Sequence, residues 1–307
     1  MNICVFYDKL ERNELKMKNF NEIYQNLQLN FEQESKAMNQ KLKKKAIIRC
    51  TIIFVLGLIF SIGTSMVTMI AVIIIMLVVA IITIQSKERI DFYEGKIIKS
   101  LVSEFNEEFH LQYYPEQGIH HSIYDEAGFE NYDRYRSEDL MTGDIEGNLL
   151  KLAEVETRVE TTDEEGNTTD TINFIGIFGH MKLNKSINSY IRFRKNNELL
   201  FSKKTQVELD SSEFEKYFDI ESNNKMVTMQ ILTPDFMEEI INKIKYKILP
   251  EIIINNDNIF IRIMKGEIFK PKLTKDLLDY DSLKREFETI DNCLSILKEL
   301  IVKINEI

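Results

Sequence analysis

Cysteine is scarce in this 307-residue chain, and tryptophan is absent. The three cysteines, Cys4, Cys50 and Cys293, lie far apart and lack the paired spacing of a disulfide framework or a structural zinc site. The sequence also lacks a Walker-type phosphate loop, a G-x-S-x-G nucleophile elbow, an H-E-x-x-H zinc motif and a dinucleotide fingerprint. These absences exclude the enzyme classes that such motifs mark, so we expect no catalytic residues and no cofactor.

Charge is missing from Cys50 to Ile84, the longest apolar run of the chain. One straight helix of that length would measure roughly 50 Å, whereas the hydrocarbon core of a bilayer is about 30 Å thick. The string I-G-T-S-M at 62–66 combines glycine with hydroxyl side chains, a composition that favours a turn. We therefore predict a transmembrane helical hairpin over 46–84, with spans 46–62 and 66–84 and the lipid bilayer as a partner. A buried helix pair in a soluble protein is the alternative.

Basic residues flank this run on both sides. They are Lys41, Lys43, Lys44, Lys45 and Arg49 before it, and Lys87, Arg89, Lys96 and Lys99 after it. The positive-inside rule counts such residues near the ends of spans. It predicts a multi-pass protein of the cell membrane with both termini in the cytoplasm.

Amphipathic helices are predicted on either side of the hairpin, over 1–45 and 85–110, where no proline interrupts the pattern. Apolar residues recur at helical spacing at Phe20, Tyr24, Leu27, Phe31, Met38 and Leu42, and again at Ile90, Tyr93, Ile97, Leu101, Phe105 and Phe109. Two helices that leave the same face of a hairpin would bury these stripes against each other as a stalk. Separate packing of each helix on the globular domain is the alternative.

A cytosolic α+β domain is predicted over 111–274. Apolar and β-branched residues dominate 149–160 and 171–183, and the turn string D-E-E-G-N separates them. Apolar and charged residues alternate over 190–194, which is typical of a half-exposed strand. The string T-P-D at 233–235 favours a helix start. Hairpins between strands and intervening helices together predict a mainly antiparallel sheet with packed helices.

A long amphipathic helix is predicted over 275–307. Its apolar residues follow a heptad spacing at Leu283, Phe287, Ile290, Leu294, Leu297, Ile301 and Ile304. Such a short seam is compatible with packing in the same chain and with a coiled coil between copies. The sequence leaves both open, and with them a homo-oligomer.

Carboxylates are concentrated from Leu111 to Asp170, where sixteen acidic residues accompany four basic ones. This charge would be repelled by phosphate backbones, so nucleic-acid binding is excluded. His120, His121 and Asp125 lie in this block and are the candidate ligands for a divalent metal. Their spacing matches no zinc pattern, and adjacent residues on a strand point to opposite faces. A salt-bridged surface is the favoured interpretation, with partners at Lys182, Lys185, Arg192, Arg194, Lys195, Lys203 and Lys204.

Six strings carry a family resemblance. They are Y-Y-P-E-Q-G-I (113–119), D-E-A-G-F (125–129), Y-R-S-E-D-L (135–140), L-N-K-S-I-N-S-Y (183–190), D-S-S-E-F-E-K-Y-F-D-I (210–220) and M-Q-I-L-T-P-D-F-M (229–237). Together they resemble an uncharacterised bacterial family of membrane proteins with a domain of unknown function. The resemblance implies two close N-terminal spans and a cytosolic α+β region, and it transfers no catalytic residue.

Two function classes follow. The first is a membrane-anchored scaffold or adaptor whose cytosolic domain binds a protein partner without catalysis. The second is a ligand sensor or metal-dependent enzyme that uses the acidic and histidine-containing region 113–144. Polar side chains that converge in one pocket would favour the second class, and side chains scattered over a surface would favour the first.

Overall fold

The computed structural model describes residues 3–60, 66–84, 86–163, 165–196, 207–245, 249–272 and 275–307. The chain divides into two compact units. Unit 1 comprises Met1–Leu101 and Phe269–Phe287, and unit 2 comprises Val102–Ile268 and Glu288–Ile307.

Unit 1 is built on long helices. Helix α1 spans Ile3–Phe60 and α2 spans Met66–Ile84. They are followed by α3 (Lys87–Phe92), the π-helical segment η1 (Tyr93–Ile98) and α4 (Lys99–Ser103). Helix α1 continues without a break through the boundary predicted between residues 45 and 46. The predicted turn lies outside the described residues, except for Met66.

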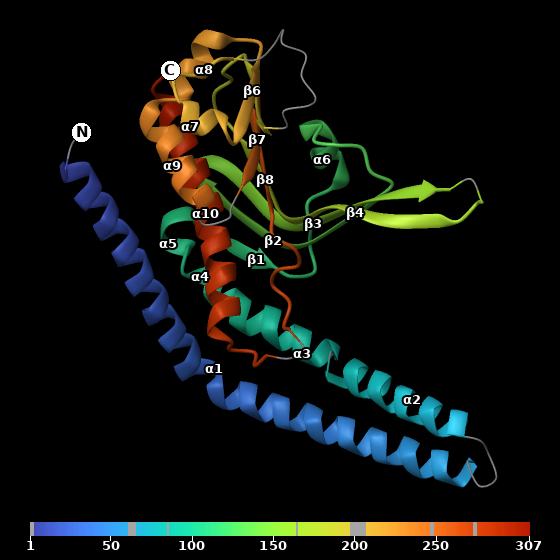
Figure 1. Ribbon diagram of the computed structural model, residues 1–307. Coiled ribbons are helices and arrows are strands. Elements are labelled where there is room, and N and C mark those ends of the chain that lie inside the picture. Colours follow the sequence, from blue (N-terminus) through green and yellow to red (C-terminus); the bar gives the residue numbers. More distant parts are fainter. Residues whose placement is uncertain are drawn as a thin grey trace. The chain divides into compact units, whose positions relative to one another are not determined.

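Helix α1 packs antiparallel to the helices that follow it, as Figure 1 shows for α1 and α2. Lys41 and Lys45 both form ion pairs with Glu88, and the Lys45 Nζ to Glu88 Oε2 distance is 2.8 Å. We call α3, η1 and α4 the return helices. Glu34, nearly two turns earlier in α1 than Lys41, pairs with Lys96 of η1, more than two turns after Glu88. Along these ion pairs the residue numbers fall in α1 while they rise in α3 and η1. The two amphipathic stretches therefore run antiparallel, as a stalk requires.

Small and polar residues line the contact between α1 and α2. Arg49 Nη1 donates a hydrogen bond of 2.9 Å to Thr83 Oγ1. A Cβ atom added to Gly57 would lie 2.8 Å from Val72 Cγ1, closer than real Cβ contacts come. The two helices therefore approach each other at a position where only glycine leaves enough room.

The outward faces of this hairpin are apolar and exposed. The exposed side chains are Ile47, Ile48, Ile52, Phe54, Val55 and Leu56 of α1 and Ile70, Ile73, Ile74, Ile75, Leu77, Val78, Ile81 and Ile82 of α2. By length and composition, one helical stretch within the described part of the chain, Ile70–Ser103, is able to cross a membrane. Unit 1 thus contains a possible single membrane span.

Buried polar contacts join the return helices to the second segment of unit 1. Arg89 is 2% exposed and donates hydrogen bonds of 2.9 Å to the carbonyls of Lys272 and Lys275. Tyr93, also 2% exposed, donates a hydrogen bond of 2.9 Å to Glu286. Burial and the neighbouring Glu286 carboxylate raise the pKa of Tyr93 well above its ordinary value, so the phenol stays protonated.

Unit 2 contains an eight-stranded sheet in the order β1-β2-β3-β4-β8-β7-β5-β6, with all neighbours antiparallel. The strands are β1 (Gln112–Tyr114), β2 (Arg134–Ile145), β3 (Asn148–Thr162), β4 (Thr168–Lys182), β5 (Tyr190–Lys195), β6 (Phe218–Ser222), β7 (Pro250–Asn255) and β8 (Asn258–Met264). The helices are α5 (Asn106–Phe109), α6 (His121–Ala127), α7 (Ser212–Glu215), α8 (Lys225–Ile231), α9 (Pro234–Lys245) and, from Glu288 onward, α10 (Tyr280–Asn305). The predicted α+β class with an antiparallel sheet and a long C-terminal helix is confirmed.

Local sequence explains the hairpin between β3 and β4. The Asp163 carboxylate accepts hydrogen bonds of 3.0 and 2.8 Å from the backbone N–H groups of Glu165 and Asn167. Gly166 adopts a φ of +85°, a conformation that strains other residues. The turn is therefore specified by the string D-E-E-G-N from which it was predicted.

Strand β2 was missed by the sequence analysis. Residues Arg134–Ser137 are exposed or only half-buried. The buried apolar residues of the strand are confined to Leu140, Met141 and Ile145. The strand also carries a register shift between Glu138 and Met141, which breaks its alternation. An irregular strand rich in charge gives no clear two-residue period.

Helix α10 buries its heptad residues within the single chain. In unit 2, Ile290, Leu294, Leu297, Ile301 and Ile304 are at most 1% exposed. A coiled coil between copies needs such residues to be free for a partner helix. Of the two alternatives that the sequence left open, packing in the same chain is the one observed.

The glycine contact gives a testable prediction. Gly57→Ile should push α1 and α2 apart, because its side chain would overlap Val72. Ala71→Ile adds similar bulk at an exposed position of α2 and is the matched control. Proximity is measured by a short bifunctional thiol reagent that links Cys50 to Met76→Cys, with Cys4 and Cys293 replaced, because Cys50 Sγ lies 3.5 Å from the Met76 carbonyl. We expect a several-fold lower yield for Gly57→Ile alone, and equal yields for both variants would contradict the close approach.

Candidate functional site

The predicted metal ligands lie close together on α6, with His120 and His121 at the start of the helix and Asp125 one turn later. His120 precedes this helix, and its Nδ1 accepts a 3.3 Å hydrogen bond from the Ser122 N–H. His121 Nδ1 lies 3.2 Å from the Asp125 Oδ2, and the two imidazole rings are 4.3 Å apart. The geometry assumed for a strand does not apply, because these residues begin a helix and their rings lie side by side.

The third candidate, Asp125, already has two hydrogen-bonding partners. Tyr132 donates a hydrogen bond of 2.6 Å to its Oδ1, and this bond, followed by that of His121, lowers the pKa of the carboxyl. The side chains of His121 and Asp125 are 56% and 52% exposed. Throughout the described ranges, no group of three or more histidine, cysteine or acidic residues is arranged to hold a metal ion.

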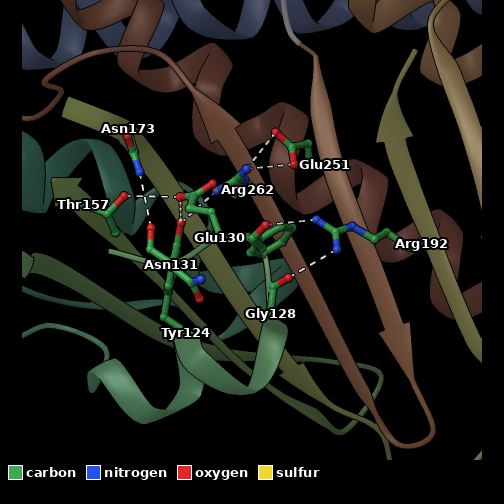
Figure 2. Close-up of polar contacts among 10 residues, drawn as sticks. Tyr124, Gly128, Glu130, Asn131, Thr157, Asn173, Arg192, Glu251 and Arg262 are labelled. Carbon is green, nitrogen blue, oxygen red and sulfur yellow. Dashed lines mark hydrogen bonds and ion pairs between the residues drawn. The ribbon is translucent and has the colours of Figure 1, made fainter. Parts of the chain in front are cut away.

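A second polar cluster, which the sequence analysis missed, surrounds Arg262 of β8 (Figure 2). The Arg262 side chain is 8% exposed, and its Nη2 donates hydrogen bonds of 3.0 and 2.9 Å to the two carboxylate oxygens of Glu251. Its Nη1 donates to the Tyr124 hydroxyl over 2.9 Å and also forms an ion pair with Glu130. One buried guanidinium thus links β7, β8, helix α6 and the loop that follows α6.

Aromatic rings cover the same guanidinium. The Arg262 Cζ atom lies 4.3 Å from the ring centroid of Phe129 and 5.1 Å from that of Phe174. Burial alone lowers the pKa of Arg262, but the carboxylates of Glu251 and Glu130 outweigh it and raise the pKa above its ordinary value. The side chain is therefore a permanent cation held between rings and carboxylates.

Arg192 of β5 holds the same loop from a different strand. Its guanidinium donates hydrogen bonds of 3.2 and 3.1 Å to the backbone carbonyls of Gly128 and Phe129, as Figure 2 shows. Asn173 of β4 donates to the Asn131 carbonyl over 3.3 Å. We call Arg192 and Arg262 the arginine latch, because together they fix the loop 128–131 onto the sheet.

The arginine latch holds α6 against a buried aromatic core. Tyr124 is 1% exposed, and its ring lies 4.9 Å from that of Phe178 and 5.9 Å from that of Phe129. Burial is the main cause that raises the pKa of Tyr124, so its hydroxyl remains a neutral donor to Glu130. A neutral phenol and a permanently charged arginine supply neither a general base nor a nucleophile near neutral pH. The hydrogen bonds of Arg262 connect α6 and the loop after it to β7 and β8.

The acidic residues between Leu111 and Asp170 form ion pairs mainly with arginines of the same segment. Arg134 pairs with Glu160 and Asp170, and Arg158 pairs with Glu156 and Asp170. The partners expected from later in the chain behave differently. Lys182 pairs with Asp257, Arg194 with Glu221 and Arg192 with backbone carbonyls, while Lys203 and Lys204 lie outside the described residues. That expectation was wrong for these three residues, because neighbouring strands β2, β3 and β4 already place Arg134 and Arg158 beside the carboxylates.

Comparison with known proteins shows that part of the chain is similar to a family of unknown function. Residues 172–301 match the family model described as "Protein of unknown function (DUF3137)". No curated protein matches the chain. Among solved structures, the chain is similar to the mycobacterial trehalose monomycolate transport factor A, TtfA, with 9% sequence identity and a TM-score of 0.34 over 69% of this chain and 97% of that chain. This is a distant structural similarity that carries no argument about function, and neither comparison indicates a catalytic site.

The latch predicts a graded loss of stability. Arg262→Met should lower the free energy of unfolding by ~3–5 kcal/mol, because it leaves two carboxylates without their buried cation. Arg192→Met removes hydrogen bonds to carbonyls and should cost about 1–3 kcal/mol. Arg136→Met is the control, since Arg136 forms an exposed ion pair with Glu138 worth at most about 1 kcal/mol. Denaturant unfolding of the solubilised full chain measures the series, and equal losses for all three variants would contradict the latch.

The imidazole pair predicts little response to metals. Because His120, His121 and Asp125 already have hydrogen-bonding partners, EDTA should leave the melting temperature of the purified protein unchanged, and His121→Ala should behave like the unsubstituted chain. Differential scanning fluorimetry with and without EDTA, followed by addition of single divalent ions, gives the measurement. A large loss of melting temperature that one ion restores, and that His121→Ala abolishes, would make these residues a metal site.

Proposed function

We propose that this protein is a membrane-anchored adaptor whose α1–α2 hairpin crosses the bilayer twice and whose sheet unit binds a protein partner in the cytoplasm. The observation that carries the proposal is the exposed apolar surface on both helices of the hairpin. A catalytic role finds no support in the acidic region, since its histidines and Asp125 have hydrogen-bonding partners at the surface.

The energetics support insertion of both helices. The six exposed large apolar side chains of α1 between Ile47 and Leu56, and the eight of α2, are each roughly half exposed, from 45% to 64%. Full burial of one such side chain is worth about 1.5–3 kcal/mol, so the hairpin would gain on the order of 10–20 kcal/mol in hydrocarbon. Helix α2 has 19 residues, a length of about 28 Å, which fits a bilayer core of about 30 Å.

Basic residues on both flanks support a cytoplasmic location for both ends of the hairpin. The ion pairs of Glu88 with Lys41 and Lys45 lie just outside the apolar run, where water can solvate them. In this arrangement the two spans return the chain to the side on which it started. The adaptor would then present all of unit 2 to the cytoplasm.

The distal part of the β3–β4 hairpin is the surface that best fits a protein partner. We call residues 158–163 and 165–172 the ribbon, and Figure 1 shows it extending beyond the rest of the sheet of unit 2. Its residues are exposed or intermediate on both faces, because β8 pairs with β4 only from Gly176 to Lys182. Two-stranded ribbons are marginally stable alone, and an open strand edge is a template for an incoming strand.

Topology tests the membrane part of the proposal. In a chain whose native cysteines are replaced, Thr64→Cys should react with a membrane-impermeant maleimide in intact cells. Asn2→Cys and Ile307→Cys should react only after the membrane is permeabilised. Reaction of all three sites in intact cells, or of Thr64→Cys only after permeabilisation, would contradict two spans with cytoplasmic termini.

Site-specific photo-crosslinking tests the partner-binding part. A photo-reactive amino acid at Thr169, in the ribbon, should give one discrete crosslinked product in native membranes. The same amino acid at Leu149 is the control, because Leu149 is 70% exposed on β3 but lies outside the ribbon. Ile172→Lys should weaken the Thr169 product by placing a charge on the exposed ribbon face. Identical products from both positions, or none from Thr169, would contradict a role for the ribbon.

A further inference from the structure

The basic residues that precede the apolar run differ in their partners. Lys41 and Lys45 form ion pairs with Glu88, and hydrogen bonds from these two lysines lower the pKa of Glu88 to about 2. Arg49 donates a hydrogen bond to Thr83. Lys43 and Lys44 are exposed, and neither has a carboxylate partner within the described part of the chain. Two positive charges therefore remain uncompensated at this point of α1.

Helical geometry places these two lysines next to the exposed apolar surface. Lys43 and Lys44 precede Ile47 and Ile48 by four residues each, so each lysine lies one turn before an isoleucine on the same face. Ile47 is 64% exposed and Ile48 is 59% exposed, and they begin the outward apolar face of α1. Ala46, which precedes Ile47 directly in sequence, is only 7% exposed and faces inward.

We propose that Lys43 and Lys44 bind the phosphate groups of anionic phospholipids at the cytoplasmic edge of the bilayer, an inference that rests on the membrane-anchored function proposed above. With Ile47 and Ile48 in the hydrocarbon, the two ammonium groups lie about one helical turn, roughly 5 Å, further out, at the depth of the headgroups. Lysine stems follow apolar surface while their charged ends reach phosphate.

Charge complementarity favours a lipid over an acidic protein segment as the occupant. The apolar surface continues directly from the lysines, so the same ligand must offer hydrocarbon and anionic groups in adjacent layers. The full chain has a net charge of −10, so an anionic membrane repels most of it and attracts this site. Each lysine near an anionic surface contributes a preference of roughly fivefold, and the preference falls with added salt.

The absence of tryptophan makes the inference directly measurable. Ile47→Trp introduces a single fluorophore one turn from Lys43, at an exposed position. The full-length protein is reconstituted into vesicles of equal parts phosphatidylcholine and phosphatidylglycerol, in which either one or the other lipid carries brominated acyl chains. We expect several-fold stronger quenching by brominated phosphatidylglycerol, because the lysines enrich that lipid around Trp at position 47.

Charge variants identify the residues responsible. Lys43→Gln with Lys44→Gln should make the two brominated lipids quench equally, and Lys43→Arg with Lys44→Arg should retain the preference. The matched control, Lys36→Gln with Lys99→Gln, also removes two exposed positive charges from unit 1 but further from the apolar run, and it should retain the preference.

The outcomes separate this inference from the proposed function. Equal quenching by both lipids in the Ile47→Trp protein that retains Lys43 and Lys44 would overturn the headgroup site. A preference for phosphatidylglycerol that survives Lys43→Gln with Lys44→Gln would also overturn it. Equal quenching is also the result expected if the lysines serve an acidic protein segment instead. If neither brominated lipid quenches the fluorophore, the membrane hairpin itself is wrong.

Discussion

The absence of charge from Cys50 to Ile84 is the constraint on which unit 1 depends. Both helices of the hairpin turn their large aliphatic side chains outward, and the contact between them uses small or polar groups such as Gly57 and the Arg49–Thr83 hydrogen bond. In a water-soluble protein this arrangement would be reversed. Helices with apolar outward faces and a more polar contact between them are expected where the surrounding solvent is lipid.

Buried arginines connect segments that are distant in sequence. The groups that accept the hydrogen bonds of the arginine differ between the two units. In unit 1, Arg89 is satisfied by backbone carbonyls of Lys272 and Lys275, so it connects the return helices to the segment that leads into α10. In unit 2, Arg262 is satisfied by carboxylates, a phenol and aromatic rings. A buried cation without such partners would be strongly destabilising, so each arginine specifies the position of the groups around it.

Sequence patterns predicted the elements whose signals are local. The β3–β4 turn follows from Asp163 and Gly166, and the buried face of α10 follows from its heptad residues. The partners of Arg262 did not follow, because Tyr124 and Glu130 lie more than 130 residues away in sequence. A lone arginine in the apolar string I-F-I-R-I at 259–263 was the available signal, since a charge in a buried strand requires a partner. Strand β2 was missed because its irregular register hides the two-residue period.

Alkaline carbonate extraction of membranes that contain the full-length protein tests the central claim most directly. This treatment releases proteins held by charge or by peripheral contacts and leaves integral proteins in the bilayer. With an apolar surface worth on the order of 10–20 kcal/mol in hydrocarbon, the full-length protein should remain in the membrane pellet. Replacement of Ile73 and Leu77, two exposed residues on the outward face of α2, by aspartate should release it to the supernatant. Quantitative release of the unsubstituted protein by carbonate would contradict the membrane-anchored account.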